Sequence, residues 1–200
     1  MHGVRAAYPQ AAPFEPAVCS YVHGVPERDG AQSRVMLGIF KLLLAAIHIV
    51  IVDAITKELA IHHLKGAPSV SLIPGIFDLA YVENKGCAWG MFQGHVWPLA
   101  LFGALALAVV LWRRKDFFFL DGPIWVRRTS TVAECLLYAG IIGNMIDRIF
   151  RGAVVDFLSF HWFDAWYFPC FNVADVAISS AAILLVFLSF AAPNRKGERK

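Results

Sequence analysis

Four long apolar runs divide the chain, and polar segments separate them. They cover residues 35–52, 96–112, 132–150 and 173–192. A helix that crosses the hydrocarbon core of a bilayer needs roughly 17–25 residues, and each run is that long. The pattern therefore predicts an all-α polytopic membrane protein, with four transmembrane helices in one domain that covers residues 35–192.

A segment between the first two runs has the period of a β-strand. From Phe77 to Tyr81, bulky apolar side chains occupy every second position, which is the spacing of side chains on one face of a sheet. The preceding Pro74-Gly75 suits the centre of a type II turn. Residues 66–82 are therefore predicted to form a small β-hairpin or sheet outside the bilayer.

Both ends of the chain are polar. Residues 1–34 contain four of the ten prolines and no apolar run long enough to span a membrane. We therefore predict a disordered N-terminal extension there. Residues 193–200 form a tail with four basic residues, which we expect on the cytoplasmic side.

The distribution of basic residues predicts the orientation. Five lie in the loop after the second run, four lie in the C-terminal tail, and Arg34 and Lys41 flank the start of the first run. Because basic loops stay in the cytoplasm, these regions and both termini are expected inside. Residues 53–95 and 151–172 then face the extracytoplasmic side.

Composition agrees with a membrane protein. Hydrophobic residues make up 58% of the chain and charged residues 16%, whereas a soluble domain has about 25% charged residues. The net charge of +3 does not indicate nucleic-acid binding, because the basic residues lie beside the apolar runs. The four cysteines show no CxxC spacing, so no zinc or redox motif is predicted. A disulfide between Cys87 and Cys170 is a hypothesis, since both lie on the predicted outer side.

Carboxyl and amide side chains collect at the predicted outer face. Asp53, Asn84, Asp156 and Asp175 all reach that face by the topology alone. Ionisable groups are costly in or near hydrocarbon, so their presence there indicates a functional site.

Asp156 and Asp175 are the candidate catalytic pair. Asp156 lies between apolar neighbours in AVVDFL, and Asp175 lies in the first turn of the fourth helix, where Asn172 can serve as N-cap. Two nearby carboxyls in a low-dielectric site share one proton. One carboxylate can then activate water as general base while the protonated partner polarises a carbonyl. The pair predicts peptide hydrolysis without a metal, a cofactor or a nucleophilic serine.

The remaining polar residues of the runs have structural interpretations. Asn144 and Asp147 share a helix face and can form hydrogen bonds across a bundle. Asp147 with Arg148 is interpreted as an ion pair or network element that orients the following loop. Asp53 and Lys57, at i and i+4, are interpreted as an interfacial ion pair.

Two other functions stay open. A small transporter or proton-relay subunit could pass protons along Asp147, Asp156 and Asp175, although the chain lacks internal repeats and broken helices. A metallopeptidase could use His161 with the aspartates. No HExxH, GxSxG or Walker A motif is present.

Several short motifs give the chain a resemblance to the bacterial lipoprotein signal peptidases (signal peptidase II), which are membrane aspartyl peptidases. The motifs are Asp53 with Lys57, ENKGCAWG at 83–90, GNMIDR at 143–148, RGAVVDF at 151–157 and FNVAD at 171–175. Their order and spacing match across residues 36–192. Cys87, Trp89 and Cys170 depart from the pattern, because alanine, phenylalanine and alanine are expected at those positions.

The resemblance implies four transmembrane helices and an extracytoplasmic β-cradle in the bacterial cell (inner) membrane. The implied partners are diacylglyceryl-modified prolipoproteins, cut just before the lipidated cysteine, and inhibitors of the globomycin type, which occupy the dyad. We expect a monomer without a cofactor. By motif position, Asp156 and Asp175 would be the catalytic dyad. The residues that would support it or shape the substrate side are Asp53, Lys57, Asn84, Gly86, Asn144, Asp147, Arg148 and Asn172.

Overall fold

The computed structural model describes residues 28–87, 91–163 and 165–192. The chain divides into two compact units, Met1–Gly38 and Ile39–Lys200. The first contributes the start of helix α1 (Arg28–Leu64), and every contact described below lies within the second. Residues 28–34, which the sequence analysis assigned to the extension, belong to this helix. Residues 1–27 of the predicted extension and the whole predicted tail lie outside the described residues.

Three further long helices correspond to the other apolar runs. They are α2 (Val96–Trp112), α4 (Ile124–Phe150) and α5 (Val173–Ala191), and a single-turn helix α3 (Arg114–Phe117) follows α2. The predicted bounds of α2 are confirmed, whereas α1 and α4 extend beyond their apolar runs, because polar residues can continue a helix past the hydrocarbon. By length and composition α4 and α5 could each cross a membrane, while α2 is a shorter apolar helix.

An antiparallel sheet contains the predicted strand region. Its order is β1 (Val70–Ile73), β2 (Phe77–Asn84), β3 (Val154–Trp162) and β4 (Trp166–Tyr167). The predicted turn between β1 and β2 is confirmed. Gly75 has a φ of +78°, and the Ile76 N–H donates to the carbonyl oxygen of Ile73 over 2.9 Å, as a type II turn requires.

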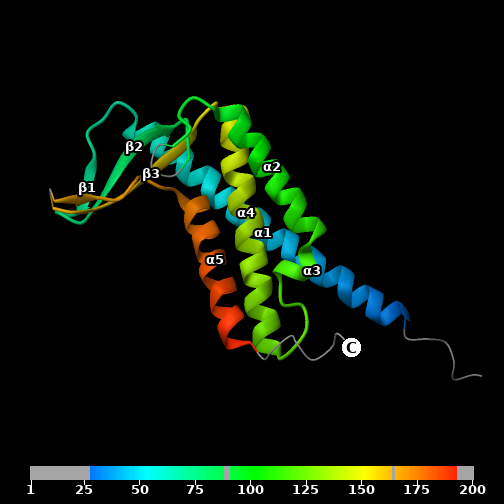
Figure 1. Cartoon of the computed structure of the whole chain (residues 1–200). Coiled ribbons are helices and arrows are strands. Elements are labelled where there is room, and N and C mark those ends of the chain that lie inside the picture. Colours follow the sequence, from blue (N-terminus) through cyan, green and yellow to red (C-terminus); the bar gives the residue numbers. More distant parts are fainter. Residues whose placement is uncertain (1–27, 88–90, 164, 193–200) are drawn as a thin grey trace, which may run out of the picture. The chain divides into compact units, whose positions relative to one another are not determined.

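Strand β3 was not predicted, and it carries Asp156. It pairs with β2 so that Asp156 lies opposite Val82. Figure 1 shows the sheet at the end of the helices where α4 finishes and α5 begins. Strand β3 follows α4 directly and leads through β4 into α5, so the sheet holds Asp156 beside the first turn of α5.

Helices α4 and α5 pack side by side (Figure 1) through small residues. A Cβ atom on Gly140 would lie 2.5 Å from the carbonyl oxygen of Ala174 and 2.6 Å from Cγ1 of Ile178. A Cβ atom on Gly143 would lie 2.7 Å from Oδ2 of Asp53. The two glycines therefore let α4 approach α5 and α1 closely.

The substitution Gly140→Ala should destabilise the chain by about 1–3 kcal/mol, because backbone and side-chain atoms of α5 already fill the space that the methyl group needs. Gly103→Ala on α2 is the matched control, since no heavy atom lies within 4 Å of its added Cβ. Thermal unfolding in detergent, followed by tryptophan fluorescence, measures both variants. Equal unfolding midpoints for the two variants would contradict this account of the packing.

Candidate active site

Asp175 lies at the start of α5 and is held by a reciprocal cap. Oδ1 of Asn172 accepts a hydrogen bond from the Asp175 N–H over 2.9 Å, and Oδ2 of Asp175 accepts one from the Asn172 N–H over 3.2 Å. The predicted N-cap is therefore confirmed. The second carboxyl oxygen, Oδ1, accepts from Nδ2 of Asn144 over 2.7 Å, so the carboxyl group of Asp175 is fixed in orientation.

Asp156 is almost fully buried, with 2% of its surface exposed. Its Oδ1 accepts from Nδ2 of Asn172 over 2.7 Å, and its Oδ2 accepts from Nδ2 of Asn84 over 3.0 Å. Burial, and then the negative charge of Asp175, raise the pKa of Asp156 to about 7. The two amide donors oppose this shift. The Asp156 carboxyl is therefore poised to hold a proton near neutral pH.

The oxygen atom of each of these asparagines has its own donor. The Gly86 N–H donates to Oδ1 of Asn84 over 2.9 Å, and Nζ of Lys57 donates to Oδ1 of Asn144 over 3.2 Å. The Asp175 N–H fills the same role for Asn172. Because every amide oxygen is occupied, each NH₂ group is directed at a carboxyl oxygen of the pair.

Lys57 is the buried cation behind this arrangement, with no exposed surface. Its Nζ lies 2.7 Å from Oδ2 of Asp53 and 3.0 Å from Oδ2 of Asp147, besides its bond to Asn144. The other oxygen of Asp53 accepts from the Ala174 N–H over 2.8 Å. The predicted pairing of Asp53 with Lys57 is confirmed, and both side chains are buried within the protein.

Asp147 and Arg148 do not form the ion pair that the sequence suggested. Oδ1 of Asp147 pairs with Nη1 of Arg151 over 3.2 Å, and Oδ2 accepts from the Val155 N–H over 3.2 Å. Arg148 instead donates to two backbone oxygens, those of Asn144 and Gly86, over 3.3 and 3.1 Å. Neighbours on a helix point in different directions, which explains the difference. The expected orientation of the following loop by Asp147 is nevertheless confirmed by its bond to Val155.

One hydrogen-bonded network thus joins all ten residues that the sequence singled out. They are Asp53, Lys57, Asn84, Gly86, Asn144, Asp147, Arg148, Asp156, Asn172 and Asp175. Arg151, although part of the RGAVVDF motif, was assigned no role in the site, and the N–H groups of Val155 and Ala174 were not predicted at all. Arg151 lies four residues after Asp147, and opposite charges at this spacing can pair on a helix, so the pair could have been predicted. Backbone donors leave no signal in a sequence.

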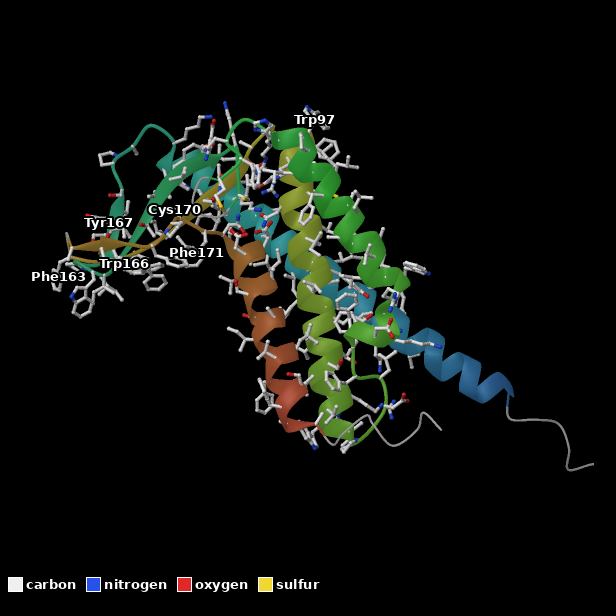
Figure 2. All side chains as sticks on the ribbon, in the orientation of Figure 1. Trp97, Phe163, Trp166, Tyr167, Cys170 and Phe171 are labelled. Atoms are coloured by element: carbon white, nitrogen blue, oxygen red, sulfur yellow. The ribbon has the colours of Figure 1, made fainter. Side chains whose placement is uncertain are left out.

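An apolar cavity of about 1020 Å³ opens onto the carboxyl pair. Helices α2, α4 and α5 supply most of its lining. Its polar lining residues include Asn84, Asn144, Arg148, Asp156, Asp175, Ser179 and Ser180. Figure 2 shows Cys170 and Phe171, which also line the cavity, where the sheet meets α5. The site can therefore present a carboxyl pair to a ligand whose greater part is apolar.

Two other sequence hypotheses fail in the structure. Within the described residues, no group of three or more His, Cys, Asp or Glu side chains could hold a metal ion. His161 lies beside Asp78, with 3.1 Å between Nε2 and Oδ2, and not beside the carboxyl pair. Cys170 is a free thiol, so the considered disulfide with Cys87 is not formed.

Comparison with known proteins adds a decisive observation. The family model described as "Signal peptidase (SPase) II" matches residues 45–191. The chain belongs to the signal peptidase II family. The match includes all ten residues of the network, so the family's sequence pattern and the hydrogen-bonded site cover the same part of the chain.

Relatives support this assignment over most of their length. A lipoprotein signal peptidase of Symbiobacterium thermophilum is 40% identical over 155 residues, which are 78% of this chain and 97% of the relative. One of Clostridium acetobutylicum is 32% identical over 161 residues, with 78% and 97% covered. In both cases the sequence similarity covers nearly the whole length of the relative.

Solved structures place the chain in a membrane. A bacterial membrane enzyme determined in meso at 2.3 Å resolution has a TM-score of 0.64 and 29% identity, covering 81% of this chain and 94% of that one. Another, at 1.9 Å, has a TM-score of 0.64 and 30% identity, with 78% and 96% covered. This member of the signal peptidase II family is therefore a membrane protein of mostly helical fold with a small antiparallel sheet.

Proposed function

We propose that this chain is a membrane aspartyl endopeptidase that removes signal peptides from diacylglyceryl-modified prolipoproteins by cutting before the lipidated cysteine. The observation that carries the proposal is the carboxyl pair Asp156 and Asp175, held by amide donors at the opening of an apolar cavity. The substrate has a peptide part and a lipid part. The carboxyl pair can hydrolyse the peptide bond, and the apolar cavity can hold the lipid. The names of the relatives agree with this substrate class.

Asp156 is the acid of the proposed mechanism, and Asp175 is the base. Asp175 takes a proton from a water molecule, whose oxygen attacks the scissile carbonyl carbon, while the proton on Asp156 moves to the carbonyl oxygen. A tetrahedral diol results. Its collapse breaks the C–N bond as a proton passes to the departing nitrogen, and one proton again remains on the pair. The other residues of the network hold the two carboxyl groups in place.

The proposed enzyme crosses the membrane four times, through α1, α2, α4 and α5. Both termini lie in the cytoplasm, and the sheet forms the extracytoplasmic β-cradle beside the active site in the bacterial cell (inner) membrane. The basic residues after α2 and after α5 support this orientation. The proposed enzyme acts as a monomer, needs no cofactor, and is blocked by inhibitors of the globomycin type that occupy the carboxyl pair.

Incubation of the detergent-solubilised chain with a diacylglyceryl-modified prolipoprotein peptide tests the proposal. Mass spectrometry should detect cleavage immediately before the lipidated cysteine, and a chelator should not reduce it. The same peptide without the lipid is the control, and it should be cut far more slowly because it cannot fill the apolar cavity. An intact lipidated peptide after incubation with folded protein would overturn the proposal.

The pH dependence of cleavage follows from the protonated state of Asp156. Because the pKa of Asp156 is raised to about 7, the acid is present below that pH and lost above it. We expect kcat/KM to fall as pH rises through about 7, approaching tenfold per unit well above it. A pH profile measured in detergent with the lipidated peptide checks this. A profile that stays flat from pH 6 to pH 9 would contradict the role of Asp156 as the acid.

A further inference from the structure

Two serine hydroxyl groups interrupt the apolar wall that α5 gives to the cavity. Ser179 and Ser180 follow Asp175 by four and five residues, and both line the cavity that contains the carboxyl pair. Side chains four residues apart share a face of a helix. Ser179 therefore lies one turn deeper than Asp175 along the same wall, and Ser180 lies next to it.

Neither hydroxyl forms a hydrogen bond with the part of the chain that the structure describes. A serine in an apolar helix usually donates back to a carbonyl oxygen of the preceding turn. Ser189 does so on the same helix, over 2.7 Å to the carbonyl oxygen of Val186. Across the described residues, Ser179 and Ser180 have no hydrogen-bond partner. Ser179 is exposed and Ser180 is half-buried, so both hydroxyls are open to a molecule bound in the cavity.

The distance of the two serines from Asp175 suits the length of the lipid part of the substrate. This step rests on the proposed function. In a diacylglyceryl thioether, the first ester carbonyl carbon is seven bonds from the nitrogen of the scissile peptide bond. An extended chain advances about 1.2 Å per bond, so this carbonyl lies at most about 8 Å from that nitrogen. Helical rise places Ser179 about 6 Å and Ser180 about 7.5 Å along α5 from Asp175.

We propose that Ser179 and Ser180 form a subsite for an ester carbonyl of the substrate's glyceride, to which a serine hydroxyl donates a hydrogen bond. The apolar residues around them contact the acyl chains, which offer no acceptor. The ester carbonyl is therefore the feature of the lipid that this subsite recognises. A lipid joined by ether bonds has the same length but lacks the carbonyl oxygen, so the enzyme discriminates against it.

Two synthetic lipopeptides test the subsite. They share one peptide and one chain length, and they carry either two hexadecanoyl esters or two hexadecyl ethers on the glycerol. The unmodified chain should cleave the diester with a kcat/KM about threefold to tenfold above that of the diether, the range of one neutral hydrogen bond. The double variant Ser179→Ala/Ser180→Ala should lose this preference through slower cleavage of the diester alone. Ser189→Ala, whose hydroxyl is bonded within α5, should keep it.

The outcomes separate this inference from the function on which it rests. Equal cleavage of the two lipopeptides by the unmodified chain would overturn the subsite and leave the peptidase assignment intact. An equal loss on both lipopeptides in the double variant would indicate altered packing and would also overturn it. If the unmodified chain cleaves neither lipopeptide, the proposed function itself is wrong.

Discussion

Replacement of Asp156 or Asp175 by asparagine should abolish cleavage of a lipidated peptide while the chain still folds. An amide can neither take a proton from water nor give one to the scissile carbonyl, and each of these roles contributes about 10²–10⁴-fold to the rate. Asparagine keeps the shape of the side chain and one acceptor oxygen. Each variant should therefore lose only about 1 kcal/mol of stability, for one lost hydrogen bond. Product formation by mass spectrometry and unfolding in detergent measure the two effects.

Asp147→Asn is the control for this pair, because Asp147 is as buried as Asp156 but touches Lys57 and Arg151, and not the other carboxyls. It should lower stability and reduce activity only in part. Substantial turnover by the Asp156 or the Asp175 variant would refute the assignment of the pair. An inactive but fully stable Asp147 variant would move the search for the catalytic carboxyl to α4.

Lys57→Met should give the largest loss of stability of any single change considered. The methionine keeps the length of the side chain but removes the cation between Asp53 and Asp147, both of which are buried. Loss of one partner from a buried ion pair costs about 3–5 kcal/mol, since a charge stays behind without compensation. The amide oxygen of Asn144 loses one of its two donors and keeps only Nδ2 of Asn172, so activity should fall as well.

Lys65→Met provides the comparison for that measurement. Lys65 pairs with Glu83 over 2.8 Å, but its side chain is 57% exposed. Exposed pairs contribute only about 0–1 kcal/mol, so this variant should unfold close to the parent chain. Similar unfolding midpoints for the Lys57 and Lys65 variants in detergent would show that the buried cation is not needed for the fold.

The sequence predicted the helices well, because each apolar run is long and no other element of that length can satisfy its backbone within hydrocarbon. The β1–β2 turn was also predictable, since Pro74 and Gly75 meet specific backbone requirements. Strand β3 was not. Its first residues, VVDFL at 154–158, do not alternate between apolar and polar side chains, so they lack the period that identifies a half-buried strand.

The members of the site were predictable, but their pairing was predictable only within one helix, as for Asp53 with Lys57 and Asn172 with Asp175. Topology alone brought Asp53, Asn84, Asp156 and Asp175 to one face. The direction of each contact depends on helix rotation, which a sequence does not give. This is why Asp147 was paired with its neighbour Arg148 in the sequence analysis, whereas in the structure it contacts Lys57 and Arg151.

The bond from Asp53 to the Ala174 N–H has a consequence for biosynthesis. It ties α1, which emerges first from the ribosome, to α5, which emerges last. A nascent chain that ends before α5 lacks Asp175 and this N–H group, so Asn172 has no helix to cap and Asn144 has no Asp175 carboxyl to hold. The proposed peptidase is therefore inactive during translation and becomes active only when its last helix packs against the others. A truncated translation product then cannot cleave proteins in the membrane.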